Sequence, residues 1–473
     1  MFENGLQNDH LNLLHIANSS AKVAIKTSTG LTQRMNIGET IMQGTVWGSL
    51  ICTSTMDQLP KLAYKNPEDL YLYKGVCIPP LEMVDDILTV TNVEKSLKMN
   101  QLVNTFIEHK RLKLSDSKCS RVHIGSDHIK CPPLKVHDSV MKDSQKEKYL
   151  GDIIDSSGKI QPTIDQRKAK GNGIVSEITS IITEIPFGKH KMEVAMKLRE
   201  AMLINGILYN SEAWHGVTRK QIASLEAIDE ALLRKLLKSH CKTPKEFLYL
   251  ETGALPLRWI VAQRRILFLK HITEKHDDEL LKKVFLAQKE NPTQGDFWLL
   301  VKEDMADLKV SYEEVTSPGL SKTQLKLRIK KNAINAAFNN LKEVQLTHKK
   351  VKHIQYPKLE IQSYLKSEIL TADETKQISA FRSNCVRGMR THFRKMYPNT
   401  YCPLNCNDSA PYEDASDHIL VCSKLTSGAI PVQNIIQVYG DIEEQEDIGN
   451  ILSKLIRLRT NILDKAEDEE PSA

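Results

Sequence analysis

The stretch Met83-Val84-Asp85-Asp86-Ile87-Leu88-Thr89-Val90 places two adjacent carboxylates between short apolar runs. The apolar and β-branched residues on both sides predict two strands, and the acidic pair predicts a tight hairpin between them. Adjacent aspartates are common in ordinary turns, so a structural role is one interpretation. The other is chemical, because carboxylates at a hairpin tip can hold Mg²⁺ and leave positions open for substrate phosphates.

The composition around this stretch is that of a globular protein. The chain has 473 residues, of which 41% are hydrophobic, 26% charged and 6% aromatic. No segment approaches the roughly 20 consecutive apolar residues of a membrane-spanning helix, so we expect no membrane partner. The first ten residues have neither the basic flank nor the apolar core of a secretory signal. We therefore expect an intracellular protein, without a distinction between nucleus and cytoplasm.

The pattern of apolar residues changes along the chain. The first 160 residues mix short strand-like runs with turn signals, as in an α+β protein. After Met192 the apolar residues follow a helical period. Ile222, Leu225, Leu232 and Leu236 share one helix face, on which Asp229 is the exception. The later part of the chain is therefore predicted to be mainly helical.

Five motifs occur in the order found in the reverse transcriptases of non-LTR retrotransposons, which this chain resembles. They are Gly38–Gly44, which looks like the Gln-Gly motif; Met83–Asp86, like the Tyr/Phe-x-Asp-Asp catalytic hairpin; Leu112–Lys118, like the following lysine motif; Tyr149–Gly151, like the primer grip; and Leu208–Trp214, like a thumb segment. Each motif is weak alone, and the resemblance rests on their order and spacing.

The resemblance implies template-directed transfer of a deoxynucleotidyl group to a primer 3′-hydroxyl. Asp85 and Asp86 would be the catalytic carboxylates and Mg²⁺ ligands, Gln43 and Gly44 would border template and nucleotide, and Lys118 would lie near the phosphates. The partners would be an RNA template, an RNA/DNA hybrid or single-stranded nucleic acid.

Plain structural interpretations of the same residues stay open. Gln43-Gly44 is also a common turn, Lys118 is also an ordinary surface lysine, and Trp214 is favoured as a core aromatic.

The chain also departs from the family pattern. The first catalytic carboxylate of the family lies on a strand upstream of the Gln-Gly motif, and Asp9, the only aspartate before Asp57, has different neighbours. The fingers are absent too, and Met83 replaces the usual aromatic. A two-metal site that lacks a bridging carboxylate binds Mg²⁺ poorly, because this ion gives up its water reluctantly. We therefore expect a truncated enzyme that is inactive on its own.

A second motif lies near the carboxyl end. Cys402, Cys406, His418 and Cys422 form the pattern C-x3-C-x11-H-x3-C. Two closely spaced pairs of soft ligands suit tetrahedral Zn²⁺, and four protein ligands leave no open position for substrate. The site would be structural or would help to hold nucleic acid. Reduced core thiols with a surface histidine are the alternative.

The segment before these cysteines is basic. Residues 322–395 contain 17 Lys or Arg against 5 Asp or Glu. Just before the Cys/His motif, the basic residues Arg382, Arg387, Arg390, Arg394 and Lys395 alternate with the rings of Phe381, His392, Phe393 and Tyr397. Basic and aromatic side chains together suit single-stranded RNA. A helix that packs Phe381 and Phe393 into a core would give the same pattern.

These observations predict an α+β protein with five regions. Residues 1–160 would be a partial reverse-transcriptase palm, 161–317 a helical thumb and connection, 318–400 a basic helical region, 401–425 a zinc knuckle and 426–473 a helix with an acidic tail. Three hypotheses remain: a truncated reverse transcriptase, a non-enzymatic nucleic-acid-binding remnant, or a gene-model fragment without a role.

Overall fold

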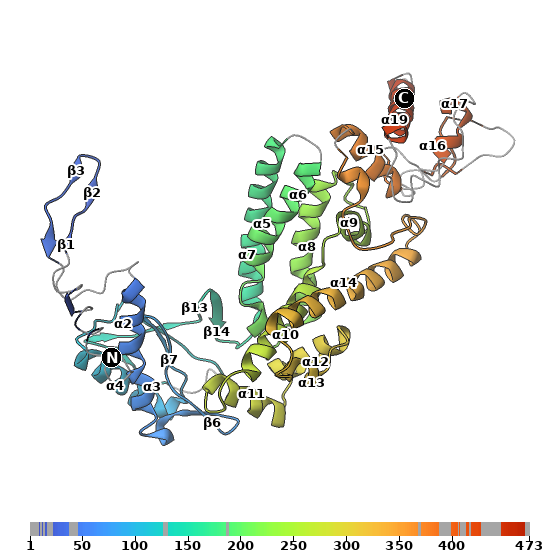
Figure 1. The fold of residues 1–473 in the computed structure, drawn as a ribbon. Coiled ribbons are helices and arrows are strands. Elements are labelled where there is room, and N and C mark those ends of the chain that lie inside the picture. Colours follow the sequence, from blue (N-terminus) through green and yellow to red (C-terminus); the bar gives the residue numbers. More distant parts are fainter. Residues whose placement is uncertain are drawn as a thin grey trace. The chain divides into compact units, whose positions relative to one another are not determined.

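The protein divides into two compact units. Unit 1 comprises Met1–Glu147, Ser156–Gly158 and Asp277–Asn291, and unit 2 comprises Lys148–Asp155, Lys159–His276 and Pro292–Ala473. The computed structural model (Figure 1) describes residues 9, 12, 15–16, 22–36, 46–125, 131–185, 189–367, 370–386, 399–404, 406, 413–415, 418–426 and 446–468. Among these residues, no helix combines the length and the apolar character that crossing a lipid bilayer requires.

The strands of the described ranges form two-stranded pairs. Five pairs are antiparallel, the pair of β9 with β12 is parallel, and β13 and β14 are joined by a two-residue turn. The pairs are β1 (Lys22–Val23) with β4 (Met35–Asn36), β2 (Lys26–Thr27) with β3 (Gly30–Leu31), β5 (Tyr71–Tyr73) with β6 (Val76–Ile78), β7 (Leu81–Met83) with β8 (Asp86–Leu88), β9 (Ser120–Val122) with β12 (Lys142–Ser144), β10 (Lys135–Val136) with β11 (Ser139–Val140), and β13 (Lys146–Tyr149) with β14 (Asp152–Asp155).

Unit 1 packs its short strands against a few helices. These helices are α2 (Val46–Met56), α3 (Gln58–Ala63), the 3₁₀ turn η2 (Pro67–Asp69), α4 (Val93–His109) and α11 (Leu280–Glu290). Met56, Leu59, Phe106 and Ile107 form a buried cluster from α2, α3 and α4, and Ile87 of β8 packs against it. Burial of this β8 side chain anchors the β7–β8 hairpin to the helices.

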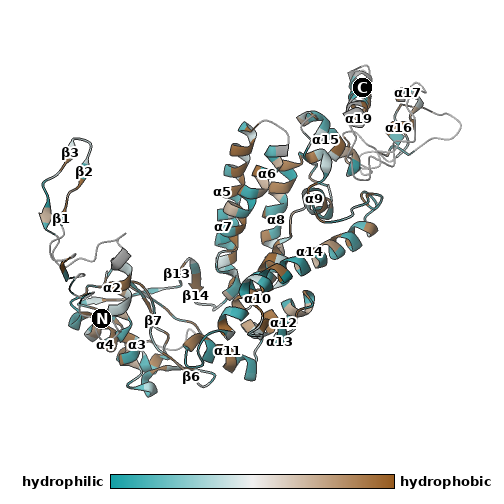
Figure 2. Ribbon diagram, viewed as in Figure 1, coloured by the Kyte–Doolittle hydropathy of each residue, from teal (hydrophilic) through white to brown (hydrophobic). Residues whose placement is uncertain are grey.

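Unit 2 is mainly helical. Its helices are α5 (Gln161–Glu184), α6 (Lys189–Leu198), the π-helical turn η3 (Arg199–Ile204), α7 (Asn205–Ile207), the 3₁₀ turn η4 (Ser211–Ala213), α8 (Arg219–Leu236), α9 (Lys245–Thr252), α10 (Leu257–Thr273), α12 (Phe297–Asp307), α13 (Tyr312–Thr316), α14 (Lys322–Thr347), the 3₁₀ turn η5 (Ser363–Leu365), α15 (Ala372–Arg382), α16 (His418–Val421), α17 (Ser423–Thr426) and α19 (Glu446–Asp468). Hydrophobic and hydrophilic residues alternate in bands along these helices, as in amphipathic helices (Figure 2).

Two hydrophobic cores organise unit 2. The first lies between α5, α6, α8 and α10, and Trp214 is buried in it. The second joins α9, α14, α15 and α19 to the segment that carries Cys402 and Cys422. The carboxyl-terminal Cys/His segment is therefore part of a larger hydrophobic core.

The prediction of an α+β protein is confirmed, and so are several local predictions. α8 covers the periodic segment and buries Ile222, Leu225 and Leu232. The core interpretation of Trp214 is correct. The boundary expected between residues 317 and 318 falls in the loop between α13 and α14, which lies within unit 2, so the structure does not separate two units there. The assignment of these regions to a palm, a thumb and a knuckle stays a prediction.

Candidate metal centre and carboxylate hairpin

The acidic pair lies at the tip of an antiparallel hairpin, as the sequence predicts. Met83 of β7 pairs with Asp86 of β8, so Val84 and Asp85 form the two-residue turn. Asp85 and Asp86 are both exposed to solvent. Their carboxylates are therefore accessible to a ligand.

The backbone of this turn is strained. Val84 has a φ of 62°, which is rare for a β-branched residue. The Cys52 Sγ donates a hydrogen bond to the Val84 carbonyl oxygen at 3.4 Å, and burial is the main reason why the pKa of this thiol is raised. Strain of this kind persists where the surrounding structure fixes the backbone, and it is frequent at functional sites.

Glu82 is a third carboxyl group of the hairpin that the sequence analysis did not single out. Burial, together with the nearby Asp57 carboxylate, raises the pKa of Glu82 to about 7. Its Oε1 atom is buried without a hydrogen-bond partner among the described residues. The sequence gives no sign of this residue, because Glu82 takes a regular strand position, paired with Ile87.

The predicted Mg²⁺ site is incomplete in the described part of the chain. No third carboxylate, histidine or cysteine there joins Asp85 and Asp86 in a group that could hold a metal ion. Binding to two exposed carboxylates alone does not offset the free-energy cost of removing water from Mg²⁺. The geometry of the described residues therefore gives no support to Mg²⁺ binding at this hairpin.

The remaining residues predicted near the nucleotide are only partly described. Gln43 and Gly44 lie outside the described residues. Lys118 is exposed in the turn between α4 and β9, and its backbone N–H donates to the Ser115 carbonyl oxygen at 3.0 Å. This exposure is compatible with both the phosphate-binding and the surface interpretation of Lys118.

The four residues of the Cys/His motif come together, as their spacing predicts. The sulfur atoms of Cys402, Cys406 and Cys422 and a ring nitrogen of His418 all lie within 4.8 Å of one another. The Cys406 Sγ lies 3.3 Å from His418 Nε2. Ligands of a tetrahedral zinc ion stand about 3.5 Å apart, so this cluster can hold a metal ion such as Zn²⁺.

Local structure fixes the two halves of this cluster. An isolated bridge between Tyr401 and Glu413 precedes Cys402, and His418 opens the short helix α16. The Ser423 Oγ donates to the Cys406 carbonyl oxygen at 2.8 Å and so joins the two ligand pairs. The ligands are thus fixed by hydrogen bonds of their own segment.

The chemistry of the cluster also suits a cation. Burial, together with the neighbouring Cys402 and Cys422 sulfurs, raises the pKa of the Cys406 thiol to about 12. Three sulfurs at this distance repel one another when ionised, and a bound dication reverses that effect by stabilising the thiolates. The donor set therefore fits Zn²⁺ in a closed site.

A buried ion pair connects the segment of the Cys/His cluster to the carboxyl-terminal helix. The Arg459 Nη2 of α19 donates to the Asp414 Oδ2 at 2.6 Å, and both side chains are almost fully buried. Asp414 lies between the two ligand pairs, and its backbone N–H donates to the Thr400 carbonyl oxygen. His418 is buried with Cys402 and Cys422, so the surface histidine of the alternative interpretation is wrong. Reduced core thiols stay an alternative to a bound ion.

The structure describes only some of the basic and aromatic residues before the cluster. Arg387, Arg390 and Arg394 lie outside the described residues. Phe381 and Arg382 are buried, and the Arg382 Nε donates to the Glu251 Oε1 at 2.9 Å. For Phe381 and Arg382 the core interpretation is correct, because both side chains are buried and Arg382 pairs with Glu251.

Two segments singled out in the sequence meet in unit 2. The Arg167 Nη2 donates to the Gly151 carbonyl oxygen at 2.9 Å and to the Asp152 Oδ1 at 2.8 Å. The Asn210 Nδ2 donates to the Asp152 Oδ2 at 2.7 Å. The turn that resembles the primer grip is thus bonded to the segment Leu208–Trp214. Arg167 could not be identified from the sequence, since nothing in its neighbourhood marks it.

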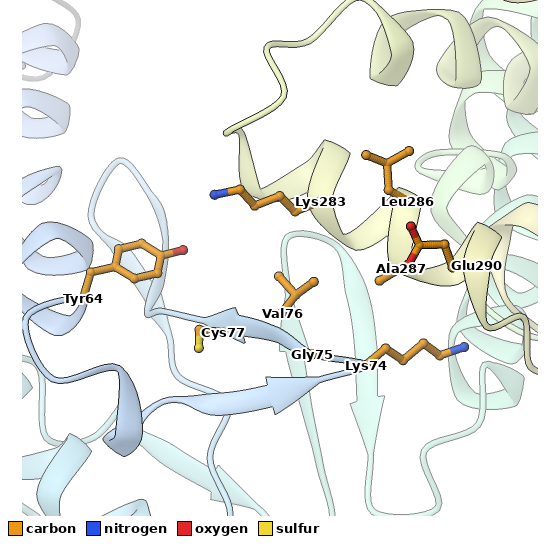
Figure 3. Close-up of a pocket in the computed structure, with 9 residues that line it drawn as sticks. All are labelled: Tyr64, Lys74, Gly75, Val76, Cys77, Lys283, Leu286, Ala287 and Glu290. Carbon is orange, nitrogen blue, oxygen red and sulfur yellow. The ribbon is translucent and has the colours of Figure 1, made fainter.

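Unit 1 also contains a pocket of about 440 Å³ between the β5–β6 hairpin and α11. Figure 3 shows Lys283 extending on the side of Tyr64, whereas Lys74 extends toward the opposite end. None of the residues predicted to act in catalysis or in binding lines this pocket. It therefore has no part in the candidate site.

Comparisons with known proteins do not assign the chain to a family. No protein-family model matches it, and no curated protein sequence matches it either.

Proposed function

We propose that this protein is a reverse-transcriptase-type polypeptide of a non-LTR retrotransposon that binds primer–template nucleic acid. The observation that carries the proposal is the exposed Asp85–Asp86 pair on a strained two-residue turn. It is followed along the chain by the β13–β14 hairpin and a helical unit, in the order of the family's catalytic hairpin, primer grip and thumb.

Exposed positive charge supports binding of nucleic acid. The first half of α14 presents the exposed side chains Lys322, Lys326, Lys330 and Lys331. α14 buries its opposite face, including Leu325 and Ile329. Lysines that are free to contact phosphates release counterions on binding, which favours association with a polyanion at low salt.

A second candidate function is nucleic-acid binding without polymerisation. Among the described residues, no third metal ligand accompanies Asp85 and Asp86, and this favours binding without polymerisation. Both functions share the nucleic-acid ligand and differ only in chemistry, so one assay can separate them.

We infer that zinc at the Cys/His cluster is structural in either case. Its four protein ligands leave no position for a substrate, and the ion would hold the segment against α19.

The test is primer extension and binding with the full chain on oligo(dT) annealed to poly(rA). We expect salt-sensitive binding, and extension in Mg²⁺ or Mn²⁺ no greater than that of Asp85→Asn. Primer extension that depends on Asp85 would establish polymerase activity and overturn the expectation that the chain is inactive. Absence of binding in dilute buffer would overturn both functions.

A further inference from the structure

The pocket of unit 1 is lined on one side by a single face of α11. Four residues of this helix contribute to the lining, namely Lys283, Leu286, Ala287 and Glu290. Their spacing of three, four and seven positions places them on the same face of the helix. Val76 of β6 lines the pocket from the hairpin. The helix therefore presents to the pocket, in order, a cation, two apolar side chains and an anion.

Two hydrogen bonds hold the β5–β6 hairpin against this helix. The Lys74 Nζ donates to the carbonyl oxygen of Asn291, the residue that ends α11. The Gln288 Nε2 donates to the Tyr73 hydroxyl oxygen at 3.2 Å. A cation at the carboxyl end of a helix is stabilising, so the Lys74 charge fastens the hairpin to α11. The walls of the pocket are therefore fixed before any ligand binds, which lowers the entropic cost of binding.

The other two charged groups of the lining are available to a ligand. Within the described part of the chain, neither the Lys283 ammonium nor the Glu290 carboxylate forms an ion pair, and the Tyr64 hydroxyl forms no hydrogen bond. The Tyr64 hydroxyl and the Lys283 ammonium point toward one another (Figure 3). Burial, with a contribution from Cys77, raises the pKa of Tyr64, so its hydroxyl stays protonated and can donate. An ammonium and a hydroxyl that face the same space form a pair of donors for a carboxylate.

We propose that this pocket is a binding site for a small monocarboxylate with an apolar body. Lys283 and Tyr64 donate to the carboxylate, and Leu286 and Ala287 contact the apolar body. The volume of about 440 Å³ lies in the range of small-molecule sites. A phosphate monoester carries close to two negative charges, so Glu290 on the same helix face disfavours it. The inference does not depend on the proposed function, because the pocket lies outside the candidate site.

The experiment uses the full chain and three probes in saturation-transfer NMR titrations at low salt. The first probe is 4-phenylbutyrate, which has both the carboxylate and the apolar body. 4-Phenylbutanol lacks the carboxylate, and butyrate lacks the ring. We expect 4-phenylbutyrate to bind with a Kd of about 1 mM, as a ligand of this size implies, and both other probes to bind more weakly.

Variants assign the two ends of the ligand. Lys283→Met keeps the apolar stem and should weaken binding of 4-phenylbutyrate about two- to fivefold, without changing the binding of 4-phenylbutanol. Tyr64→Phe should act in the same direction, because it removes one donor. Leu286→Ala should weaken both phenyl probes equally. The control is Lys65→Met, which removes an exposed lysine of unit 1 that does not line the pocket and should bind as the wild type does.

Each outcome decides for or against the site. Weaker binding of 4-phenylbutyrate in Lys283→Met, with 4-phenylbutanol and Lys65→Met unchanged, would support a carboxylate site at Lys283. Equal binding of 4-phenylbutyrate and 4-phenylbutanol by the wild type would overturn it, and so would the absence of binding. Should Lys283→Met lose both phenyl probes through misfolding, Tyr64→Phe still decides, because it keeps the ring and removes only the hydroxyl.

Discussion

The Asp85–Asp86 hairpin and the Cys402–Cys422 cluster are both candidate metal sites, but their surroundings differ. The two aspartates are exposed at the end of a hairpin, and the described residues offer them no third ligand. The Cys/His cluster brings four ligand atoms within 4.8 Å of one another, and three of its four residues are buried, two of them as members of a large hydrophobic core.

The difference shows what a metal site needs beyond its ligands. The Cys/His ligands lie within one short segment, so local hydrogen bonds and packing can preorganise them. Mg²⁺ keeps several of its waters and is usually held by one or two carboxylates together with substrate phosphates. We therefore expect the Cys/His cluster to bind its ion alone, and the hairpin not to.

The largest effect is expected from loss of a zinc ligand. Zinc contributes about 10–16 kcal/mol to the folding of isolated zinc-finger peptides, so Cys406→Ser should release the ion and expose its segment. Amide hydrogen exchange should become fast over residues 399–426 and in α19, while α5 and α8 stay protected. Cys241→Ser is the control, because Cys241 is exposed and outside the cluster. Unchanged protection in Cys406→Ser would show that the segment folds without metal.

A smaller effect should follow from breaking the ion pair between α19 and the cluster. Arg459→Met removes the guanidinium from the buried Asp414 carboxylate, and breaking this buried ion pair should cost about 3–5 kcal/mol of unfolding free energy. Arg457→Met, two residues earlier on the same helix, removes a pair with Asp373 in which both side chains are largely exposed. That change should cost less than about 1 kcal/mol. Urea unfolding of the zinc-loaded chain measures both, and equal costs would contradict the burial of Arg459.

The smallest effect concerns pH and the hairpin. Because the pKa of Glu82 is raised to about 7 in the folded chain, its carboxylate destabilises the hairpin above that pH, and stability rises as pH falls toward the ordinary carboxyl range. Glu82→Gln should flatten this pH dependence and stabilise the hairpin at pH 8 by about 1 kcal/mol. The effect is this small because solvent screens the charge of a half-exposed side chain. Exchange rates of the β7–β8 amides at pH 5 and pH 8 measure it. A pH dependence that survives in Glu82→Gln would exclude this residue as the cause.

Local patterns in the sequence predicted much of the fold and of the metal centre. The apolar runs around Asp85 predicted the hairpin, and the helical period predicted α8. The spacing of the four Cys/His ligands predicted their cluster, because each ligand pair is only a few residues apart. In each case, neighbours along the chain determine the structure.

Features that depend on distant residues could not be predicted. Asp229 interrupts the apolar face of α8 because it pairs with the buried Arg199. The Arg199 guanidinium donates two hydrogen bonds of 2.6 Å to the Asp229 carboxylate. In the same way, Arg382 looked like an RNA-binding residue, although Glu251 holds it in the core. Nothing in the spacing of these residues identifies a partner that lies 30 or 131 positions away.

The contrast between the two sites can be tested in one measurement, by equilibrium dialysis of the reduced full chain against Zn²⁺ and Mn²⁺, with Mn²⁺ as a probe of the Mg²⁺ site. We predict about one zinc per chain, lost in Cys406→Ser and kept in Cys241→Ser, and no manganese that depends on Asp85. Stoichiometric manganese that disappears in Asp85→Asn, or a folded chain without zinc, would contradict the account.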